Sequence, residues 1–339
     1  MSRGHAVSNV LIIEGYLASL MPEGPAIEQA TLGSQFDVLR FGALAEVPAD
    51  MLADAAALIV RPGVAFGAEQ IRGLHQCKVI VSLGVGYEHI DRGAAREHGI
   101  PVCNVPDFGP EEAADTALSM MLHLHRRMGA LQARAHSGPL EWDWRVQQPT
   151  HRARDSALGI IGLGLIGTSF ALKAKAIGYN VSFFDPYVPR GMEKSLGFAR
   201  VHDMEDLLPT SDIVSIHTPL TDDTRGMVNA AFLDAMKSDG VLLNISRGGL
   251  FESLDVLYDH LRRRPDFCVG ADVVPEEPPG EHPLLDAWRS NTSWLSGRFF
   301  LTPHSAFYSE ESVRDLRRFS AETAAWALSG NPPYNVVNR

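Results

Sequence analysis

The chain has 339 residues, of which 45% are hydrophobic and 21% are charged, a composition typical of soluble globular proteins and not of disordered or fibrous ones. This length predicts two domains of ordinary size. Thirty Lys and Arg residues against 41 Asp and Glu residues give a formal net charge of -11, and no basic run is long enough to follow a phosphate backbone, so direct nucleic-acid binding is not expected.

The cysteines and the N-terminal region indicate the compartment. Cys77, Cys103 and Cys268 lie far apart without metal-ligand spacing, which fits a reducing environment. The apolar run Val10–Ile13 ends at Glu14 and is too short for a signal peptide or a membrane span. We therefore expect a cytoplasmic protein without membrane association. The histidines also lack metal-ligand spacing, so no metal is expected.

The first hundred residues alternate short apolar runs with helix-like or turn-rich stretches. This alternation predicts a small parallel sheet with helices on both faces. The predicted strands are Val10–Ile13, Val38–Phe41, Ala57–Val60, Val79–Leu83 and Pro101–Val105.

A long helix is predicted to begin at Pro110, where proline suits the first helical turn and acidic residues follow at once. Apolar residues at steps of three or four continue this pattern to Leu131, with Arg126 and Arg127 in the C-terminal half. We expect this helix to carry the chain between the two domains.

After a loop that contains Trp142 and Trp144, the strand–helix alternation begins again, which predicts a second doubly wound sheet. A helix at Glu310–Leu328 in the tail is expected to fold back onto the first domain. The expected fold class is therefore α/β, with a domain of residues 108–305 inserted into a discontinuous domain of residues 1–107 and 306–339. The predicted strands of the inserted domain are Leu158–Ile161, Val181–Phe184, Ile213–Ile216, Val241–Ile245, Val269–Val273 and Phe299–Thr302.

Residues 162–167 form a glycine-rich loop, Gly-Leu-Gly-Leu-Ile-Gly, between a predicted strand and a predicted helix at Thr168–Ala176. In a dinucleotide-binding unit, Gly162 allows the tight turn, Gly164 lets the backbone approach a pyrophosphate, and Gly167 permits close packing of helix on sheet. The helix N-terminus supplies N–H groups for the anion. A glycine-rich turn without a ligand is the alternative, because the motif alone is weak evidence.

Asp185 ends the next predicted strand, eighteen residues after Gly167, where an acid that accepts hydrogen bonds from the adenosine ribose belongs. A carboxylate at this position repels a 2′-phosphate, so NAD is favoured over NADP as the cofactor. Arg190, five residues on, leaves NADP as an alternative. A turn-initiating aspartate before Pro186 is the alternative without a ligand.

Six further segments resemble the D-isomer-specific 2-hydroxyacid dehydrogenase family and extend the likeness over most of the chain. The stretches 184–187 and 304–310 are most similar to the C-terminal-binding-protein branch, which includes NAD-linked corepressors as well as enzymes. The resemblance implies a Rossmann NAD-binding domain inserted into a flavodoxin-like substrate domain. The six segments are His217–Leu220, Asn244–Gly249, Ala271–Pro278, Leu301–Ala306, Leu83–Tyr87 and Val102–Pro106.

The resemblance implies three catalytic residues. Arg247 would hold the substrate carboxylate and keto oxygen, Glu277 would partner His304, and His304 would exchange a proton with the C2 oxygen. A guanidinium matches a planar carboxylate with two parallel hydrogen bonds, and a carboxylate beside an imidazole favours the protonated ring. Taken singly, a loop turn, a solvated charge and a strand end are the structural alternatives.

Further site residues are implied by the same resemblance. Asp272 would bind the nicotinamide carboxamide, with a capping role as the alternative. Arg61 would read the distal end of the substrate, or else form a surface salt bridge. The other implied cofactor contacts are Gly162, Gly164, Leu165, Ile166, Gly167, Asp185, Thr116, His217, Thr218, Pro219, Thr224, Ile245, Ser246, Arg247, His304 and Ala306. The implied substrate contacts are Arg61, Val85, Gly86, Arg247, His304 and Phe307.

The expected function is hydride transfer between NAD(H) and a small 2-keto or D-2-hydroxy acid. An NAD(H)-sensing binding protein with little turnover is the alternative, and the family implies a homodimer. Two segments depart from the family pattern. Phe251-Glu252-Ser253 follows the Arg247 loop where the family usually has Val-Asp-Glu, and residues 286–298 lengthen the connection to His304, which we expect to affect the pocket mouth or the dimer surface.

Overall fold

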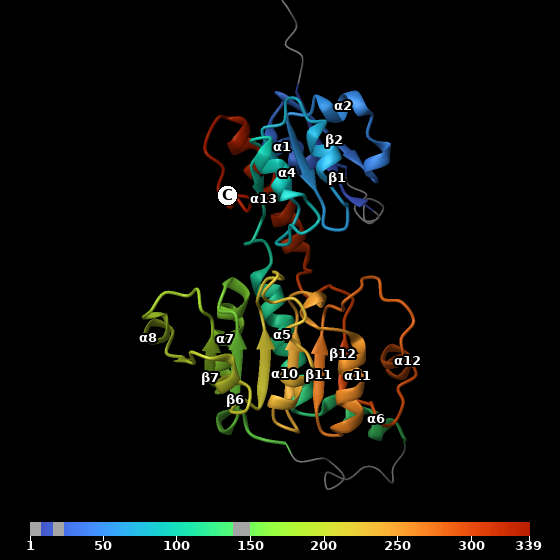
Figure 1. The fold of residues 1–339 in the computed structure, drawn as a ribbon, viewed down its shortest axis with the longest axis vertical. Helices are drawn as coiled ribbons and strands as arrows, with labels where there is room; N and C mark the ends of the chain where they lie inside the picture. The colour runs from blue at the N-terminus through green and yellow to red at the C-terminus, as the bar shows by residue number, and fades with distance from the viewer. Residues whose placement is uncertain (1–7, 16–23, 138–149) are drawn as a thin grey trace, which may run out of the picture. The chain divides into compact units, whose positions relative to one another are not determined.

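The computed structural model describes residues 8–15, 24–137 and 150–339 (Figure 1). The chain divides into two compact units, the first of residues 1–109 and 309–339 and the second of residues 110–308. The predicted tryptophan loop, with Trp142 and Trp144, lies outside the described residues.

The first unit is built on a five-stranded parallel sheet in the order β2-β1-β3-β4-β5. Its central strands β3 and β4 are buried along their whole length and are almost entirely apolar, because helices cover both faces. This strand order is that of flavodoxin-like folds. The strands are β1 (Ser8–Ile13), β2 (Phe36–Phe41), β3 (Ala57–Val60), β4 (Val79–Ser82) and β5 (Val102–Cys103), and the helices are α1 (Ala26–Leu32), α2 (Ala49–Ala53), α3 (Ala68–Arg72), α4 (Arg92–Glu97) and α13 (Glu310–Leu328).

The C-terminal segment packs on this first unit. Helix α13 contacts α1, β3 and β4. Arg317 on α13 forms a buried, two-pronged ion pair with Glu28 on α1, with both N···O distances at 2.7 Å. Near the chain end, the Asn338 side chain accepts from the Val102 N–H and donates to the Ile100 carbonyl. These contacts make the tail part of the core of the first unit.

The second unit is a seven-stranded parallel sheet in the order β12-β11-β10-β9-β6-β7-β8 (Figure 1). The direction of winding reverses between β6 and β9, which is the switch point of a Rossmann fold. The predicted fold class of two doubly wound parallel-sheet domains is confirmed. The strands are β6 (Ala157–Ile161), β7 (Asn180–Phe184), β8 (Ala199–Arg200), β9 (Ile213–Ile216), β10 (Val241–Asn244), β11 (Cys268–Ala271) and β12 (Phe299–Leu301).

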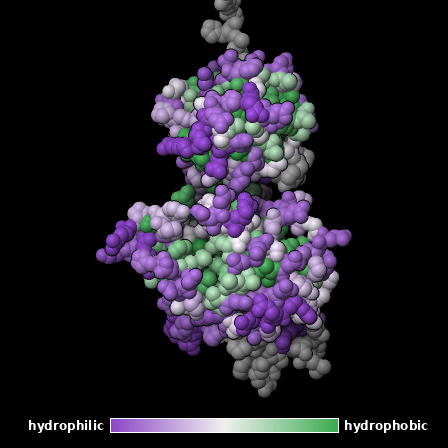
Figure 2. Space-filling model, in the orientation of Figure 1, coloured by the Kyte–Doolittle hydropathy of each residue, from purple (hydrophilic) through white to green (hydrophobic). Residues whose placement is uncertain are grey.

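Helices cover both faces of this second sheet, so each face has its own apolar core. One core includes Met120 and Phe170 from α5 and α7, and the other includes Phe232 and Leu257 from α10 and α11. On the visible surface of each unit, hydrophilic side chains predominate (Figure 2). No helix in the described ranges is both long and apolar enough to cross a membrane. The helices are α5 (Pro110–His125), α6 (Met128–Ser137), α7 (Leu165–Ile177), α8 (Met192–Leu196), α9 (Met204–Leu207), α10 (Ala230–Ala235), α11 (Leu254–Arg263) and α12 (Pro283–Arg289), with 3-10 turns at Ala153–Asp155 and Gly248–Leu250. A further 3-10 turn, Leu44–Glu46, belongs to the first unit.

The prediction of one continuous helix from Pro110 to Leu131 was wrong. Helix α5 ends at His125, and Arg127 has a left-handed backbone, with φ 54°, before α6 begins. This break lets the buried Arg127 guanidinium donate to the Asp266 carbonyl at 2.7 Å and to Cys268 Sγ at 2.5 Å. Because these acceptors lie about 140 residues away along the chain, the helical periodicity carries no sign of them.

The segment 286–298 packs within the second unit. It completes α12 and then places Trp294 edge-on to Tyr258, with ring centroids 5.7 Å apart. Arg298 is buried and donates to the carbonyls of Trp294, Leu261, Arg264 and Phe267, which joins the segment to the end of α11. The expected effect of this segment on the pocket mouth or dimer surface stays a prediction.

Candidate active site

The three predicted catalytic residues follow three neighbouring strands of the second unit. Arg247 follows β10, Glu277 follows β11 and His304 follows β12. These strands are parallel and adjacent, so their carboxyl ends lie at one edge of the sheet. In doubly wound sheets, ligands bind outside this edge.

His304 and Glu277 form a direct hydrogen bond, with Nδ1 2.6 Å from Oε2. The other carboxylate oxygen accepts from the Val274 N–H at 3.1 Å. Burial alone would raise the pKa of Glu277, but the hydrogen bond and charge of His304, the Val274 N–H and the charge of Arg247 outweigh it, so the pKa lies below its ordinary value. The ionised carboxylate therefore fixes Nδ1 as a donor, and Nε2 is the ring nitrogen that can exchange a proton with a bound molecule.

The Arg247 loop is fixed by Asn244, the last residue of β10. The Asn244 amide donates to the Arg247 carbonyl at 3.0 Å, and its oxygen accepts from the Ser246 N–H at 3.0 Å. The Arg247 Nη1 donates to the Ser246 carbonyl at 2.7 Å. Asn244 is fully buried. It was not predicted as a site residue, although an asparagine directly after an apolar run and three residues before an arginine was the available signal in the sequence.

The Arg247 loop is in close contact with the Glu277 loop. A Cβ added to Gly248 would lie 1.7 Å from the Val274 carbonyl oxygen, so glycine alone fits there. Val274 also donates its N–H to Glu277. The structure therefore brings Arg247, Glu277 and His304 together through directly packed loops.

The glycine-rich loop has the geometry that an anion site at a helix N-terminus requires. Gly162 has φ +92°, and a Cβ on Gly167 would lie 2.1 Å from the Gly162 carbonyl oxygen, so both positions need glycine. A Cβ on Gly164 would meet nothing within 4 Å, which leaves open space beside the start of α7 at Leu165. The N–H groups of this helix terminus can donate to the oxygens of a pyrophosphate there.

Asp185 follows β7 and caps its own loop. Its Oδ2 accepts from the Leu163 N–H at 2.7 Å, and its Oδ1 accepts from the N–H groups of Tyr187 and Val188 at 2.8 and 3.2 Å. A carboxylate has about four acceptor positions, so one remains for a ribose hydroxyl. The turn-forming contacts and the predicted cofactor role are therefore compatible.

Two buried polar atoms beside the glycine-rich loop fit a bound cofactor. Among the described residues, His217 Nδ1 and Thr218 Oγ1 have no hydrogen-bond partner. A Cβ on Gly162 would lie 2.9 Å from the His217 carbonyl carbon, so these atoms lie close to the loop. Burial lowers the pKa of His217 to about 3, which keeps the ring neutral. A ligand that completes these hydrogen bonds would remove the cost of leaving them unpaired.

The other predicted cofactor residues of the second unit lie on loops after its strands or on α5 and α7. Thr116 on α5 donates to the Ala306 carbonyl at 3.3 Å, which ties that helix to the His304 turn. Thr224 donates to the Pro219 carbonyl at 2.7 Å and closes the loop after Thr218. Ile245 is buried, Leu165 and Ile166 begin α7, and the Ser246 hydroxyl donates to the Thr218 carbonyl.

The predicted substrate residues divide between the two units. Arg61 follows β3, and Val85 and Gly86 follow β4, at the carboxyl ends of the first sheet. The Val85 carbonyl accepts from the Asn104 amide at 2.8 Å, and the Gly86 carbonyl accepts from the Ser82 hydroxyl at 2.5 Å. Phe307 follows the His304 turn in the second unit. Substrate binding by these residues stays a prediction.

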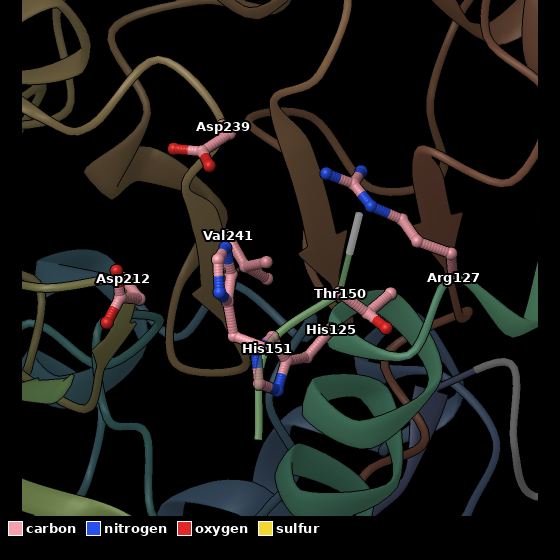
Figure 3. A pocket seen from close by; sticks show the side chains of 7 residues that line it. All are labelled: His125, Arg127, Thr150, His151, Asp212, Asp239 and Val241. Carbon is pink, nitrogen blue, oxygen red and sulfur yellow. The ribbon is translucent and has the colours of Figure 1, made fainter. Parts of the chain in front are cut away.

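A polar pocket at the opposite edge of the second sheet does not belong to this site. It lies where strands begin, near Val241 and Asp212, and Figure 3 shows its lining side chains. Asp212 accepts from the Ala157 N–H at 2.7 Å and from Lys237 Nζ at 2.6 Å, and His125 bonds to the Tyr179 hydroxyl at 2.7 Å. These contacts join neighbouring elements and indicate a structural role.

The fold and the glycine-rich loop define a dinucleotide-binding protein. Residues 118–306 match the family described as D-isomer specific 2-hydroxyacid dehydrogenase, NAD binding domain. The chain belongs to this family and contains its NAD-binding domain, as the sequence motifs predicted.

Two curated relatives and two solved structures show the range of the likeness. D-3-phosphoglycerate dehydrogenase of Methanocaldococcus jannaschii is 33% identical over 289 residues, which cover 85% of this chain and 53% of the relative. C-terminal-binding protein 1 of Caenorhabditis elegans is 31% identical over 312 residues, 86% of this chain and 40% of the relative. The chain thus spans about half the length, or less, of these curated relatives.

The solved structures are matched along almost their whole length. D-lactate dehydrogenase from Aquifex aeolicus, complexed with NAD and lactic acid, is 25% identical, with a TM-score of 0.81 and coverage of 95% of this chain and 96% of that chain. A glyoxylate reductase from Paecilomyes thermophila is 25% identical, with a TM-score of 0.82 and coverage of 98% and 99%.

Proposed function

We propose that this protein is an NAD-dependent D-2-hydroxyacid dehydrogenase that interconverts a small 2-keto acid and the corresponding D-2-hydroxy acid. The observation that carries the proposal is the His304–Glu277 hydrogen bond, at 2.6 Å, beside the packed Arg247 loop. When bound, NADH supplies the hydride that adds to C2 of the keto acid. The protein must then supply a proton to the C2 oxygen and hold the substrate carboxylate.

His304 is the proposed proton donor in the reducing direction. Negative charge grows on the C2 oxygen as C2 is reduced, and the Nε2 proton of the imidazolium moves to that oxygen to give the hydroxyl group. Glu277 accepts from Nδ1 and so stabilises the imidazolium that starts this transfer. Proton transfer of this kind contributes about 10²- to 10⁴-fold to the rate. In the oxidising direction the neutral ring takes the proton back.

Arg247 is the proposed anchor for the substrate carboxylate and keto oxygen. Its planar guanidinium can hold a carboxylate with two parallel hydrogen bonds, which a lysine cannot reproduce. Its position is set by Asn244 and by the contact of Gly248 with Val274. Phe307 offers an aromatic wall, which favours a keto acid with an apolar side chain, and Arg61, Val85 and Gly86 are proposed to complete substrate recognition.

NAD is the proposed redox partner, in preference to NADP. The supporting observation is Asp185, whose carboxylate repels a 2′-phosphate and keeps one acceptor position for a ribose hydroxyl. The A. aeolicus relative is solved with NAD and lactic acid.

Turnover of NADH with a panel of 2-keto acids, followed by absorbance, tests the proposal. We expect the wild-type protein to oxidise NADH with at least one keto acid, and His304→Ala to lose about 10²- to 10⁴-fold in kcat while still binding NADH. His282→Asn is the matched control, because His282 also pairs with a carboxylate, Asp255 at 3.1 Å, but its other ring nitrogen caps α12 by accepting from the Leu284 N–H at 3.1 Å. An equal loss in both variants would contradict the assignment of His304.

A binding role with little turnover is the second candidate, favoured by the match to C-terminal-binding protein 1 of C. elegans. Tight NADH binding without turnover across a broad keto-acid panel would support it over the dehydrogenase. A homodimer and a cytoplasmic location are further proposals. Sedimentation of the purified protein tests the dimer, and fractionation of the source cells tests the location.

A further inference from the structure

Three successive backbone N–H groups around the proposed proton donor converge on one residue, Asp272. The His304 N–H donates to the Asp272 carbonyl at 2.8 Å. The Ser305 N–H donates to Oδ1 and the Ala306 N–H donates to Oδ2, both at 2.9 Å. The side chain is therefore held in a concave set of N–H donors. Burial raises the pKa of Asp272 above its ordinary value, and the hydrogen bonds from Thr302, Ala306 and Ser305 offset part of that rise. Asp272 is 1% exposed.

These bonds stabilise an unfavourable backbone conformation at His304. Its φ is 51°, in the left-handed region that side chains other than glycine rarely adopt. Such a conformation persists only where the surrounding structure over-determines it, and it is found preferentially at functional sites. Asp272 accepts from all three N–H groups of residues 304 to 306, and the His304 N–H also donates to the Thr302 carbonyl at 3.1 Å.

Thr302 connects the same carboxylate to strand β12. Its hydroxyl donates to Asp272 Oδ1 at 2.5 Å, and its N–H donates to the Ala271 carbonyl at 3.0 Å. Asp272 follows β11 and Thr302 follows β12, so this bond fixes the ends of two neighbouring strands to each other. The position of the His304 ring relative to Glu277 is thus set from both strands.

We propose that Asp272 is a positioning residue for the general acid, which holds the 302–306 turn so that His304 Nδ1 meets Glu277 and Nε2 is presented for proton transfer. This inference rests on the proposed function, since it names what that turn serves. It goes beyond the cofactor contact that the family resemblance implies. Three of about four acceptor positions of the carboxylate are already taken by Thr302, Ser305 and Ala306.

Asp272→Asn tests the inference with almost no change in shape. The NH₂ group of asparagine cannot accept a hydrogen bond, so one of the bonds from the Ser305 and Ala306 N–H groups is lost. The turn and the His304 ring should therefore shift. We expect kcat to fall by about tenfold to a hundredfold, because misplacement of a catalytic group by about 1 Å costs about that much. NADH affinity, measured by fluorescence titration, should change by less than about threefold. A variant that keeps its kcat but binds NADH at least about tenfold more weakly would show a cofactor ligand instead, and overturn the inference.

Two variants of Thr302 test the inference if Asp272→Asn does not fold. Thr302→Val keeps the shape but removes the hydroxyl that Asp272 accepts, and Thr302→Ser keeps the hydroxyl. We expect Thr302→Val to lower kcat by about threefold to tenfold without changing NADH affinity, and Thr302→Ser to restore it. Equal kcat in Thr302→Val and the wild type would overturn the inference.

An NMR signal from the His304 ring tests this inference independently of the proposed function. Nitrogen NMR of the histidine rings, with the His304 signal assigned by its loss in His304→Gln, reports the Nδ1 hydrogen bond to Glu277 without any substrate. In Asp272→Asn, we expect the His304 ring signal to shift toward its position in Glu277→Gln, where the hydrogen bond to the carboxylate is lost. In the wild type, the signal should keep the position of a hydrogen-bonded Nδ1. If the wild type lacks turnover, the proposed function fails, but an unshifted His304 signal in Asp272→Asn is what refutes the positioning role.

Discussion

The contact between the Arg247 and Glu277 loops predicts that Gly248→Ala disables the active site although the added group is one methyl. The new Cβ would lie 1.7 Å from the Val274 carbonyl oxygen, half of the 3.4 Å at which ordinary contact begins. The loops must therefore separate by about 1.7 Å, since both sides of the clash are backbone and cannot turn away. A displacement of about 1 Å in a catalytic constellation costs about a hundredfold in rate, so we expect kcat/KM for the keto acid to fall by at least about a hundredfold.

Gly249→Ala in the same loop is the control. Its Cβ would meet Leu220 Cδ2 at 2.9 Å, the far end of a side chain that can change rotamer. We expect this variant to keep kcat/KM within about threefold of the wild type. Steady-state NADH oxidation gives kcat/KM, and thermal unfolding shows whether each variant remains folded. A folded Gly248→Ala protein with wild-type kcat/KM would refute the argument that this contact positions Arg247 against Glu277.

Three further predictions concern the stability of the fold and cofactor choice. Arg317→Ala leaves the buried Glu28 carboxylate unpaired and should lower the free energy of unfolding of the first unit by about 3–5 kcal/mol, measured by urea unfolding. Arg318→Ala, on the exposed face of α13, should leave this free energy nearly unchanged. Equal losses of stability in the two variants would refute a special role for the buried pair. The pKa of His217 falls from 6.5 to about 3 on folding, so between these values the unfolded chain binds a proton that the folded chain does not. The free energy of unfolding should therefore fall as the pH drops through this window. His217→Gln should reduce the slope of this free energy against pH by about 1.4 kcal/mol per pH unit, measured by urea unfolding at pH 7.5, 6 and 5. An unchanged slope would contradict the buried neutral ring. Asp185→Ser should weaken NADH binding by about tenfold in fluorescence titration and narrow the preference for NADH over NADPH, and an unchanged ratio would remove Asp185 as the selecting residue.

The fold could be predicted from sequence where a strand is buried on both faces. β6 and β9 are mostly apolar and almost wholly buried because helices cover them on either side, and their lengths were predicted nearly residue for residue. Strand β8 was missed because neither of its two residues, Ala199 and Arg200, is buried. Strand β5 is as short and also lies at a sheet edge, but Val102 and Cys103 are both buried and apolar, so its sequence carries a pattern that β8 lacks.

The break at Arg127 and the role of Asp272 could not be predicted for a different reason. Local periodicity describes which face of a helix is buried, but the break at Arg127 depends on acceptors at Asp266 and Cys268. For Asp272, the sequence left two roles open, a cap and a cofactor ligand. The distances show that its carboxylate caps the His304 turn, and this depends on a strand pairing between β11 and β12 that no local pattern encodes.

The chemistry of the site depends on neighbouring parallel strands that end together. Arg247, Glu277 and His304 lie up to 57 residues apart in sequence, yet each follows one of three adjacent strands. The loops are joined pairwise, by Gly248 against Val274 and by Asp272 to the residues from Thr302 to Ala306. These links are backbone contacts and hydrogen bonds to a buried carboxylate, so a change in one loop displaces the neighbouring loop. The anion-binding and proton-transfer groups should therefore respond to mutation as a unit, which is the behaviour expected of residues that share one network.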